Sequence, residues 1–104
     1  MIINEKGSTY EYDGVVYTIG DRVRVVEHSD YAGLEGYIKE ICTDEDMDTE
    51  NPDIDIYCNF ETPTNPEIAK QLETTFSDIF GSPHSIDDIN IDEVVMAPDE
   101  IEII

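Results

Sequence analysis

Residues 20–41, GDRVRVVEHSDYAGLEGYIKEI, decide the fold of this chain. Two segments in which apolar and polar residues alternate flank a loop that contains Gly33 and Gly36. Alternation with a period of two predicts β-strands with one buried face. Glycine permits the backbone conformations and close approaches that such a connection needs. The stretch therefore predicts an antiparallel pair of strands.

Further strands extend this pair on both sides. Residues 15–19 and 54–60 show the same alternation, and residues 93–98 and 99–104 supply one or two final strands interrupted at Pro98. Branched and aromatic side chains in these segments suit a pleated surface. In residues 37–42, alternation assigns Tyr37, Lys39 and Ile41 to one face and Ile38, Glu40 and Cys42 to the other.

The period changes to that of a helix in residues 66–80. Asn65 can cap the first turn, and Gly81 can end the helix in the left-handed conformation. The apolar face expected to pack on the sheet consists of Ile68, Leu72, Phe76, Ile79 and Phe80. We expect Phe76 and Ile79 to be buried between helix and sheet.

Charge is the dominant compositional feature. The chain has 26 acidic residues against 5 Lys and Arg, for a formal net charge of −21. Such a field opposes binding to nucleic acids and anionic membranes and favours basic partners. No apolar run approaches the ~20 residues of a membrane span, and the N-terminus lacks the features of a signal peptide. We therefore expect a cytoplasmic protein in which Cys42 and Cys58 are buried thiols.

The opening stretch resembles the KOW motif of ribosomal proteins and bacterial transcription elongation factors. The matching features are Gly20-Asp21, Val23, Val25, Gly33, Gly36, Ile38 and Ile41. Those families use the motif inside small SH3-like β-barrels. The resemblance and the strand pattern together predict one α+β domain over residues 1–104. The expected fold of this domain is a strongly bent antiparallel barrel of about five strands, with the helix 66–80 inserted before the last strand.

The bases of this stretch bear on the function that the resemblance implies. KOW domains that bind RNA surround the motif with Lys and Arg, whereas this chain is strongly acidic. We therefore expect Arg22, Arg24 and Lys39 to neutralise nearby acids. The expected partners are Asp21, Glu27 and Glu40.

Two runs of acidic residues are candidate partner-binding sites. The first contains Asp44, Glu45, Asp46, Asp48, Glu50, Asp53 and Asp55, and the second contains Asp87, Asp88, Asp92 and Glu93. Rows of carboxylates at the charge density of B-DNA, about one charge per 1.7 Å, would fit a groove that binds nucleic acid. The C-terminal segment is also similar to small acidic proteins of bacterial mobile elements, several of which are anti-restriction or anti-CRISPR DNA mimics.

Three functions remain open from the sequence. The first is an acidic protein-binding module, in its sharpest form a DNA mimic that inhibits a nucleic-acid-binding enzyme. The second is a KOW-type accessory factor that binds the ribosome or RNA polymerase. The third is a soluble acidic domain whose surface has no partner. An exposed basic stripe would favour the second, and contiguous exposed acids would favour the first.

No residue pattern predicts a cofactor, a metal or a catalytic site. Asp44, Asp46 and Asp48 have the spacing of an EF-hand loop, but Thr49 stands at the glycine position and Asp55 at the position of the bidentate glutamate. His28 and His84 are isolated, whereas a structural zinc site needs about four Cys or His ligands. Among so many acids, pairs of carboxylates occur by chance. We therefore expect no enzyme.

The acidic loop should not form a tight calcium site. Isothermal titration with Ca²⁺ should reveal no stoichiometric binding tighter than ~10 μM, the scale of EF-hand sensors. A stoichiometric site tighter than that would contradict this expectation.

Overall fold

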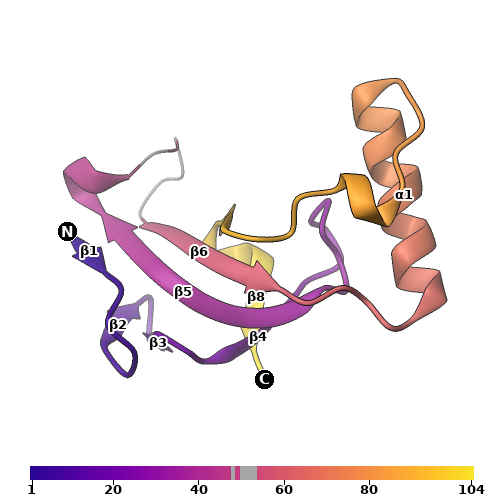
Figure 1. Ribbon diagram of the computed structural model, residues 1–104. Coiled ribbons are helices and arrows are strands. Elements are labelled where there is room, and N and C mark those ends of the chain that lie inside the picture. Colours follow the sequence, from indigo (N-terminus) through magenta and orange to yellow (C-terminus); the bar gives the residue numbers. More distant parts are fainter. Residues whose placement is uncertain (48, 50–53) are drawn as a thin grey trace.

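The computed structural model describes residues 1–47, 49 and 54–104 (Figure 1). Its strands are β1 (Ile2–Ile3), β2 (Thr9–Tyr12), β3 (Val15–Thr18), β4 (Arg22–Val25), β5 (Glu35–Thr43), β6 (Ile54–Phe60), β7 (Val94–Met96) and β8 (Ile101–Ile103). Its helices are α1 (Pro66–Phe80) and the 3₁₀ turns η1 (Asp44–Asp46), η2 (Ile86–Asp88) and η3 (Pro98–Glu100). Within the described ranges, no helix has the length and apolar character needed to span a membrane.

The main sheet is antiparallel and is built around β5. The strand order is β7-β6-β5-β4-β8, and β1 pairs with the far end of β5. One edge of β5 pairs with β6, while β4 and then β1 pair along the opposite edge. The strands β2 and β3 form a separate hairpin. The predicted α+β class is therefore confirmed.

A short connection bends this sheet. Only residues 97–100 join β7 at one edge to β8 at the other. In a flat sheet, four strand spacings would separate these edges by about 19 Å. Four residues that include a 3₁₀ turn, which rises only ~2 Å per residue, are too short for that distance. The sheet must curl, as β5 does in Figure 1.

The curled sheet stays open within the part of the chain that the structure describes. There, β7 and β8 do not pair with each other. The backbone N–H of Val26, which follows β4, instead donates to the carbonyl of Glu100 in η3 over 2.8 Å. The strong bend is thus present, but the closed barrel expected from the sequence is not.

The core lies on one face of the bent sheet. It is formed by apolar side chains of the strands, together with Ile19, Leu34 and Ile89 from loops and with Leu72 and Phe76 from α1. Ile38, Ile41, Ile56 and Cys58 are fully buried in its centre.

A β-bulge at Lys39 reassigns the faces of β5. The register against β6 shifts between Ile38 and Glu40, so that Lys39 is the inserted residue. Ile38 and Ile41 consequently both enter the core, although strict alternation placed them on opposite faces. That prediction was wrong because one inserted residue reverses the alternation beyond it.

Gly36 allows β5 and β6 to approach closely. A Cβ atom at this position would lie 2.0 Å from the carbonyl oxygen of Asn59 and 2.7 Å from the Cα of Phe60. Both are backbone atoms of the paired strand, so no side chain fits. The close packing expected of this glycine is confirmed.

The helix α1 has the predicted bounds and caps. The side chain of Asn65 accepts a hydrogen bond from the backbone N–H of Glu67 over 2.9 Å. At the other end, Gly81 adopts the left-handed conformation with φ of 68°. Local sequence therefore sets both ends of this helix.

Only part of the predicted helix face is buried. Leu72 and Phe76 are 1% and 8% exposed, and the ring of Phe76 lies 5.0 Å from that of Tyr31. Ile79 and Phe80 are 53% and 61% exposed, so the prediction that Ile79 is buried was wrong. The reason is that α1 stands beyond the end of the sheet, beside the loop between β4 and β5, and does not lie across it (Figure 1).

Substituting Phe76 and Ile79 in turn should distinguish the buried part of the helix face from the exposed part. Phe76→Ala should lower the free energy of unfolding by about 3–5 kcal/mol, because it leaves a cavity beneath α1. Ile79→Ala is the matched control and should change stability little, because its side chain is exposed. Urea denaturation of both variants tests this, and equal losses would contradict the observed position of α1.

Candidate functional site

The first predicted acidic cluster lies at the tip of the β5–β6 hairpin. Asp44, Glu45 and Asp46 form η1 and are exposed. The N-terminal ammonium of Met1 donates to Asp46 over 2.5 Å and to the carbonyl of Thr43 over 2.9 Å. The hydrogen bond to Asp46 raises the pKa of this ammonium. Three further predicted members, Asp48, Glu50 and Asp53, lie outside the described residues.

Asp55 does not belong to an exposed cluster. Its side chain is fully buried, where it accepts hydrogen bonds from the backbone N–H and the hydroxyl of Thr49. A buried carboxylate needs such donors because it has lost its hydration. The sequence predicted that Asp55 contacts a partner. Its burial corrects that prediction, because a fully buried side chain cannot reach a partner on the surface.

The second predicted cluster is exposed, but two of its four carboxylates already form hydrogen bonds or ion pairs within the protein. The carboxylate of Asp88 accepts hydrogen bonds from the backbone N–H and the hydroxyl of Ser85, over 3.2 and 3.1 Å. These bonds lower the pKa of Asp88. Glu93 forms an ion pair with Lys39. Asp87 and Asp92 are exposed, and no ion pair or hydrogen bond of their carboxylates occurs within the described part of the chain.

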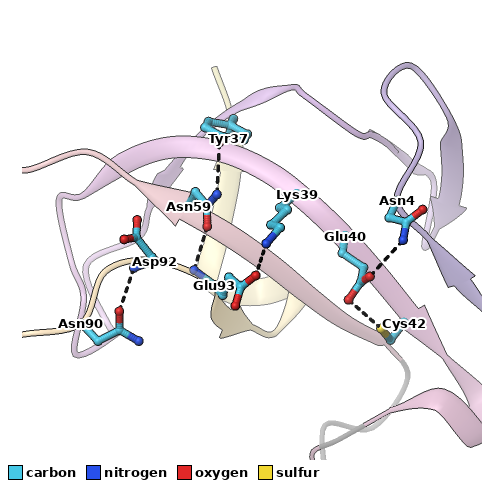
Figure 2. Close-up of polar contacts among 9 residues, drawn as sticks. All are labelled: Asn4, Tyr37, Lys39, Glu40, Cys42, Asn59, Asn90, Asp92 and Glu93. Atoms are coloured by element: carbon cyan, nitrogen blue, oxygen red, sulfur yellow. Dashed lines mark hydrogen bonds and ion pairs between the residues drawn. The ribbon is translucent and has the colours of Figure 1, made fainter.

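A polar network holds the segment 90–93 on the outer face of the sheet, as Figure 2 shows. Asn59 of β6 donates to the hydroxyl of Tyr37 over 3.1 Å and accepts from the backbone N–H of Glu93 over 2.7 Å. The backbone N–H of Asp92 donates to Asn90 over 3.1 Å. Sequence reasoning did not single out Asn59, although its outward position on β6 was the available signal.

The two clusters do not form one site. η1 lies at one end of the β5–β6 hairpin, whereas η2 lies beside α1 at the other end (Figure 1). The molecule measures 38 Å along its longest axis. Exposed acids are therefore distributed along the length of the domain.

The three bases of residues 20–41 are paired with acids, but not with the expected ones. Arg22 contacts Glu61 at 2.6 Å and Glu35 at 4.0 Å, and Lys39 pairs with Glu93. Arg24 contacts Glu35 at 3.5 Å and Glu102 at 3.4 Å. The predicted partners were neighbours in sequence, whereas most of the observed partners are brought near by sheet pairing or by loops.

The pair between Arg22 and Glu61 shifts both ionisation equilibria. Its hydrogen bond, followed by the attraction of the opposite charges, lowers the pKa of Glu61 and raises the pKa of Arg22. Both side chains are exposed, so solvent screens the interaction and its contribution to stability is small. The carboxylate of Glu61 nevertheless offsets the positive charge of the Arg22 guanidinium at neutral pH.

The two cysteines lie on the neighbouring strands β5 and β6. Cys42 and Cys58 are buried thiols, and the register places Cys42 opposite Asp55 and Cys58 opposite Ile38. Burial raises the pKa of the Cys58 thiol to about 12, so the reactive thiolate is not populated at neutral pH. Within the described ranges, no three His, Cys, Asp or Glu side chains are placed to hold a metal ion.

No protein-family model, curated protein or solved structure matches this chain. Function is therefore inferred from the chain's own geometry and charge.

The burial of Cys58 predicts slow thiol chemistry. In a Cys42→Ser variant, Ellman's reagent at pH 8 should not react with the folded protein, because Cys58 is buried and its thiol stays protonated. Unfolding in urea should release one reactive thiol. Rapid labelling of the folded variant would show that Cys58 is accessible.

Proposed function

We propose that this protein is an acidic protein-binding module that presents a DNA-like charge density to a basic partner. The observation that carries the proposal is the ratio of charge to length. A net charge of −21 along 38 Å corresponds to about one charge per 1.8 Å, compared with about 1.7 Å for the axis of B-DNA. A surface with this density suits the basic groove of a nucleic-acid-binding enzyme, such as a nuclease or a helicase.

The distribution of the acids supports this proposal. Exposed carboxylates occur at both ends of the β5–β6 hairpin, and Glu45, Asp87 and Asp92 are exposed members of the two clusters. Association with a basic groove would be steered by long-range attraction, which raises the association rate more than it slows dissociation. The module would act by occupying the groove and would carry out no catalysis.

The KOW-type alternative receives less support from the surface. It requires a basic stripe that is free to contact RNA, whereas Arg22, Arg24 and Lys39 are each paired with glutamates. Residues 20–41 supply β4, the loop after it and most of β5, so this proposal gives them a role in the fold and none in binding the basic partner. The strand order and the short crossing through η3 support a partly open SH3-like barrel as the finer fold.

A cytoplasmic location is part of the proposal. Both cysteines are buried thiols, and the thiol is the ordinary state of cysteine in a reducing compartment. The basic partner would then be an intracellular protein that handles nucleic acid.

Removing exposed acids from the two clusters tests the proposal. The variant Glu45→Gln, Asp87→Asn, Asp92→Asn removes three charges without a described side-chain contact. The control Glu5→Gln, Glu11→Gln, Asp13→Asn removes the same charge from exposed positions at the β2–β3 end. A basic partner captured from lysate at low salt should bind the cluster variant with an association rate several-fold lower, and the control nearly normally. The association rate should also fall steeply as salt rises.

Two outcomes would contradict the proposal, and a third would overturn only its assignment to the two clusters. That third outcome is equal slowing in both variants, which would show that total charge matters and the clusters do not. Direct binding of the isolated protein to duplex DNA or RNA at physiological salt, in a gel shift, would instead favour the KOW-type function. Failure to capture any basic partner at any salt would leave an acidic surface without a partner.

A further inference from the structure

Three of the five basic residues of this chain line one groove. A groove of about 500 Å³ is lined by eight residues, three of which are Lys6, Arg22 and Lys39. None of the eight is acidic, although acids outnumber bases 26 to 5 in the chain. The groove lies where β1 and β4 diverge along the same edge of β5. Its lining therefore has the opposite sign of charge to the molecule as a whole.

Three separate segments bring these bases together. Lys6 belongs to the β1–β2 connection, which is held in place because the N–H of Gly7 donates to the carbonyl of Ile19 over 3.0 Å. Its aliphatic stem lies over Gly20, where a Cβ atom would be 3.6 Å from the Lys6 Cγ. Arg22 comes from β4, and Lys39 lies on the outer face of β5, at the bulge.

The groove also has an aromatic side chain that a ligand can reach. Ile19 and Ile38 border the groove as well, but they are 5% and 0% exposed and offer a ligand almost no surface. Tyr37 is 42% exposed and lies directly opposite Arg22 in the pairing of β4 with β5. Its hydroxyl is fixed by Asn59, as Figure 2 shows. An aromatic ring between two bases offers contact to a ligand that combines an apolar body with an anionic group.

We propose that this groove binds a small organic anion with an aromatic or apolar body and a carboxylate or phosphate-monoester head. The head would contact Lys6 and Arg22, and the body would lie against Tyr37. The volume falls within the ~300–1,000 Å³ of small-molecule sites. A net charge of −21 repels a polyanion, whereas a ligand with one or two charges meets mainly the local bases.

The protein's own carboxylates compete with such a ligand. Arg22 is held by Glu61 and Lys39 by Glu93, and all four side chains are exposed. Exposed pairs of this kind contribute little and exchange readily. Lys6 takes part in no ion pair within the described residues. Removing a competing carboxylate should therefore strengthen ligand binding, an effect opposite in sign to removing a base.

Phenyl phosphate and benzoate are suitable probes, with phenol as the neutral analogue. In ¹H–¹⁵N spectra, one or both anions should produce saturable shifts at Lys6, Gly20 and Tyr37 with a Kd of about 1 mM or tighter, a range typical of weak single sites. The preferred anion identifies the head group. Phenol should produce no comparable shifts.

Two variants should change the affinity in opposite directions, and each has a matched control. Lys6→Gln should weaken binding about tenfold, because it removes one charge-assisted contact, whereas Lys70→Gln on α1 removes the same charge far from the groove and should not. Glu61→Gln should tighten binding, because it removes the nearer of the two carboxylates that contact Arg22. Its control, Glu67→Gln at the start of α1, should leave binding almost unchanged.

Several results would overturn this inference. Shifts that do not saturate, or that map outside the groove, would show that no site exists. Equal weakening in the Lys6→Gln and Lys70→Gln variants would reduce the effect to net charge. Tighter binding of a short oligonucleotide than of either small anion would replace the proposed ligand class with nucleic acid. The inference does not rest on the acidic-module function, because Lys6→Gln leaves the acidic clusters intact.

Discussion

The four-residue connection between β7 and β8 is the constraint on which the rest of the structure depends. Because residues 97–100 are too short to cross a flat sheet, the sheet has to curl until its edge strands approach η3. The curl encloses the core on one face and leaves the outer face to charged and polar side chains. Gly36 and the bulge at Lys39 accommodate this geometry in β5, one by removing a side chain and the other by adding a residue.

The acidic composition is compatible with this fold because most of the charge stays in solvent. Nearly all of the described acids are exposed or half-buried, and fully buried Asp55 is hydrogen-bonded to Thr49. A carboxylate at the surface keeps its hydration and costs little, whereas mutual repulsion opposes compactness. Three of the five bases, Arg22, Arg24 and Lys39, pair with glutamates on the outer face of the sheet, where they reduce this repulsion locally.

Two surfaces of opposite character follow from this arrangement. Carboxylates are exposed at both ends of the β5–β6 hairpin, and so along the length of the molecule. The groove between β1 and β4 is instead lined by bases beside Tyr37. Long-range fields depend on total charge, so the acidic surface governs encounters with large partners. Contacts within a groove depend on the nearest side chains, so a small anion can bind where a polyanion is repelled.

The amino-acid sequence by itself determined the elements whose causes are local. The helix 66–80 begins at its Asn-Pro cap and ends at Gly81 as predicted, and the alternating segments 22–25 and 54–60 are strands. The net charge and the burial of both cysteines were also predictable, because composition and strand pattern suffice for them. Each of these features depends on residues within one or two turns or on a simple sum.

Only the tertiary structure decided features that depend on distant segments. The bulge at Lys39 reversed the faces of β5, the packing of β6 in the sheet buried Asp55, and the position of α1 beyond the sheet left Ile79 exposed. The pairing of Arg22 with Glu61 and the convergence of Lys6 with it likewise join residues far apart in sequence. Local propensity carries no information about such contacts, because the register and curl of a sheet are set by pairing and packing across the whole domain.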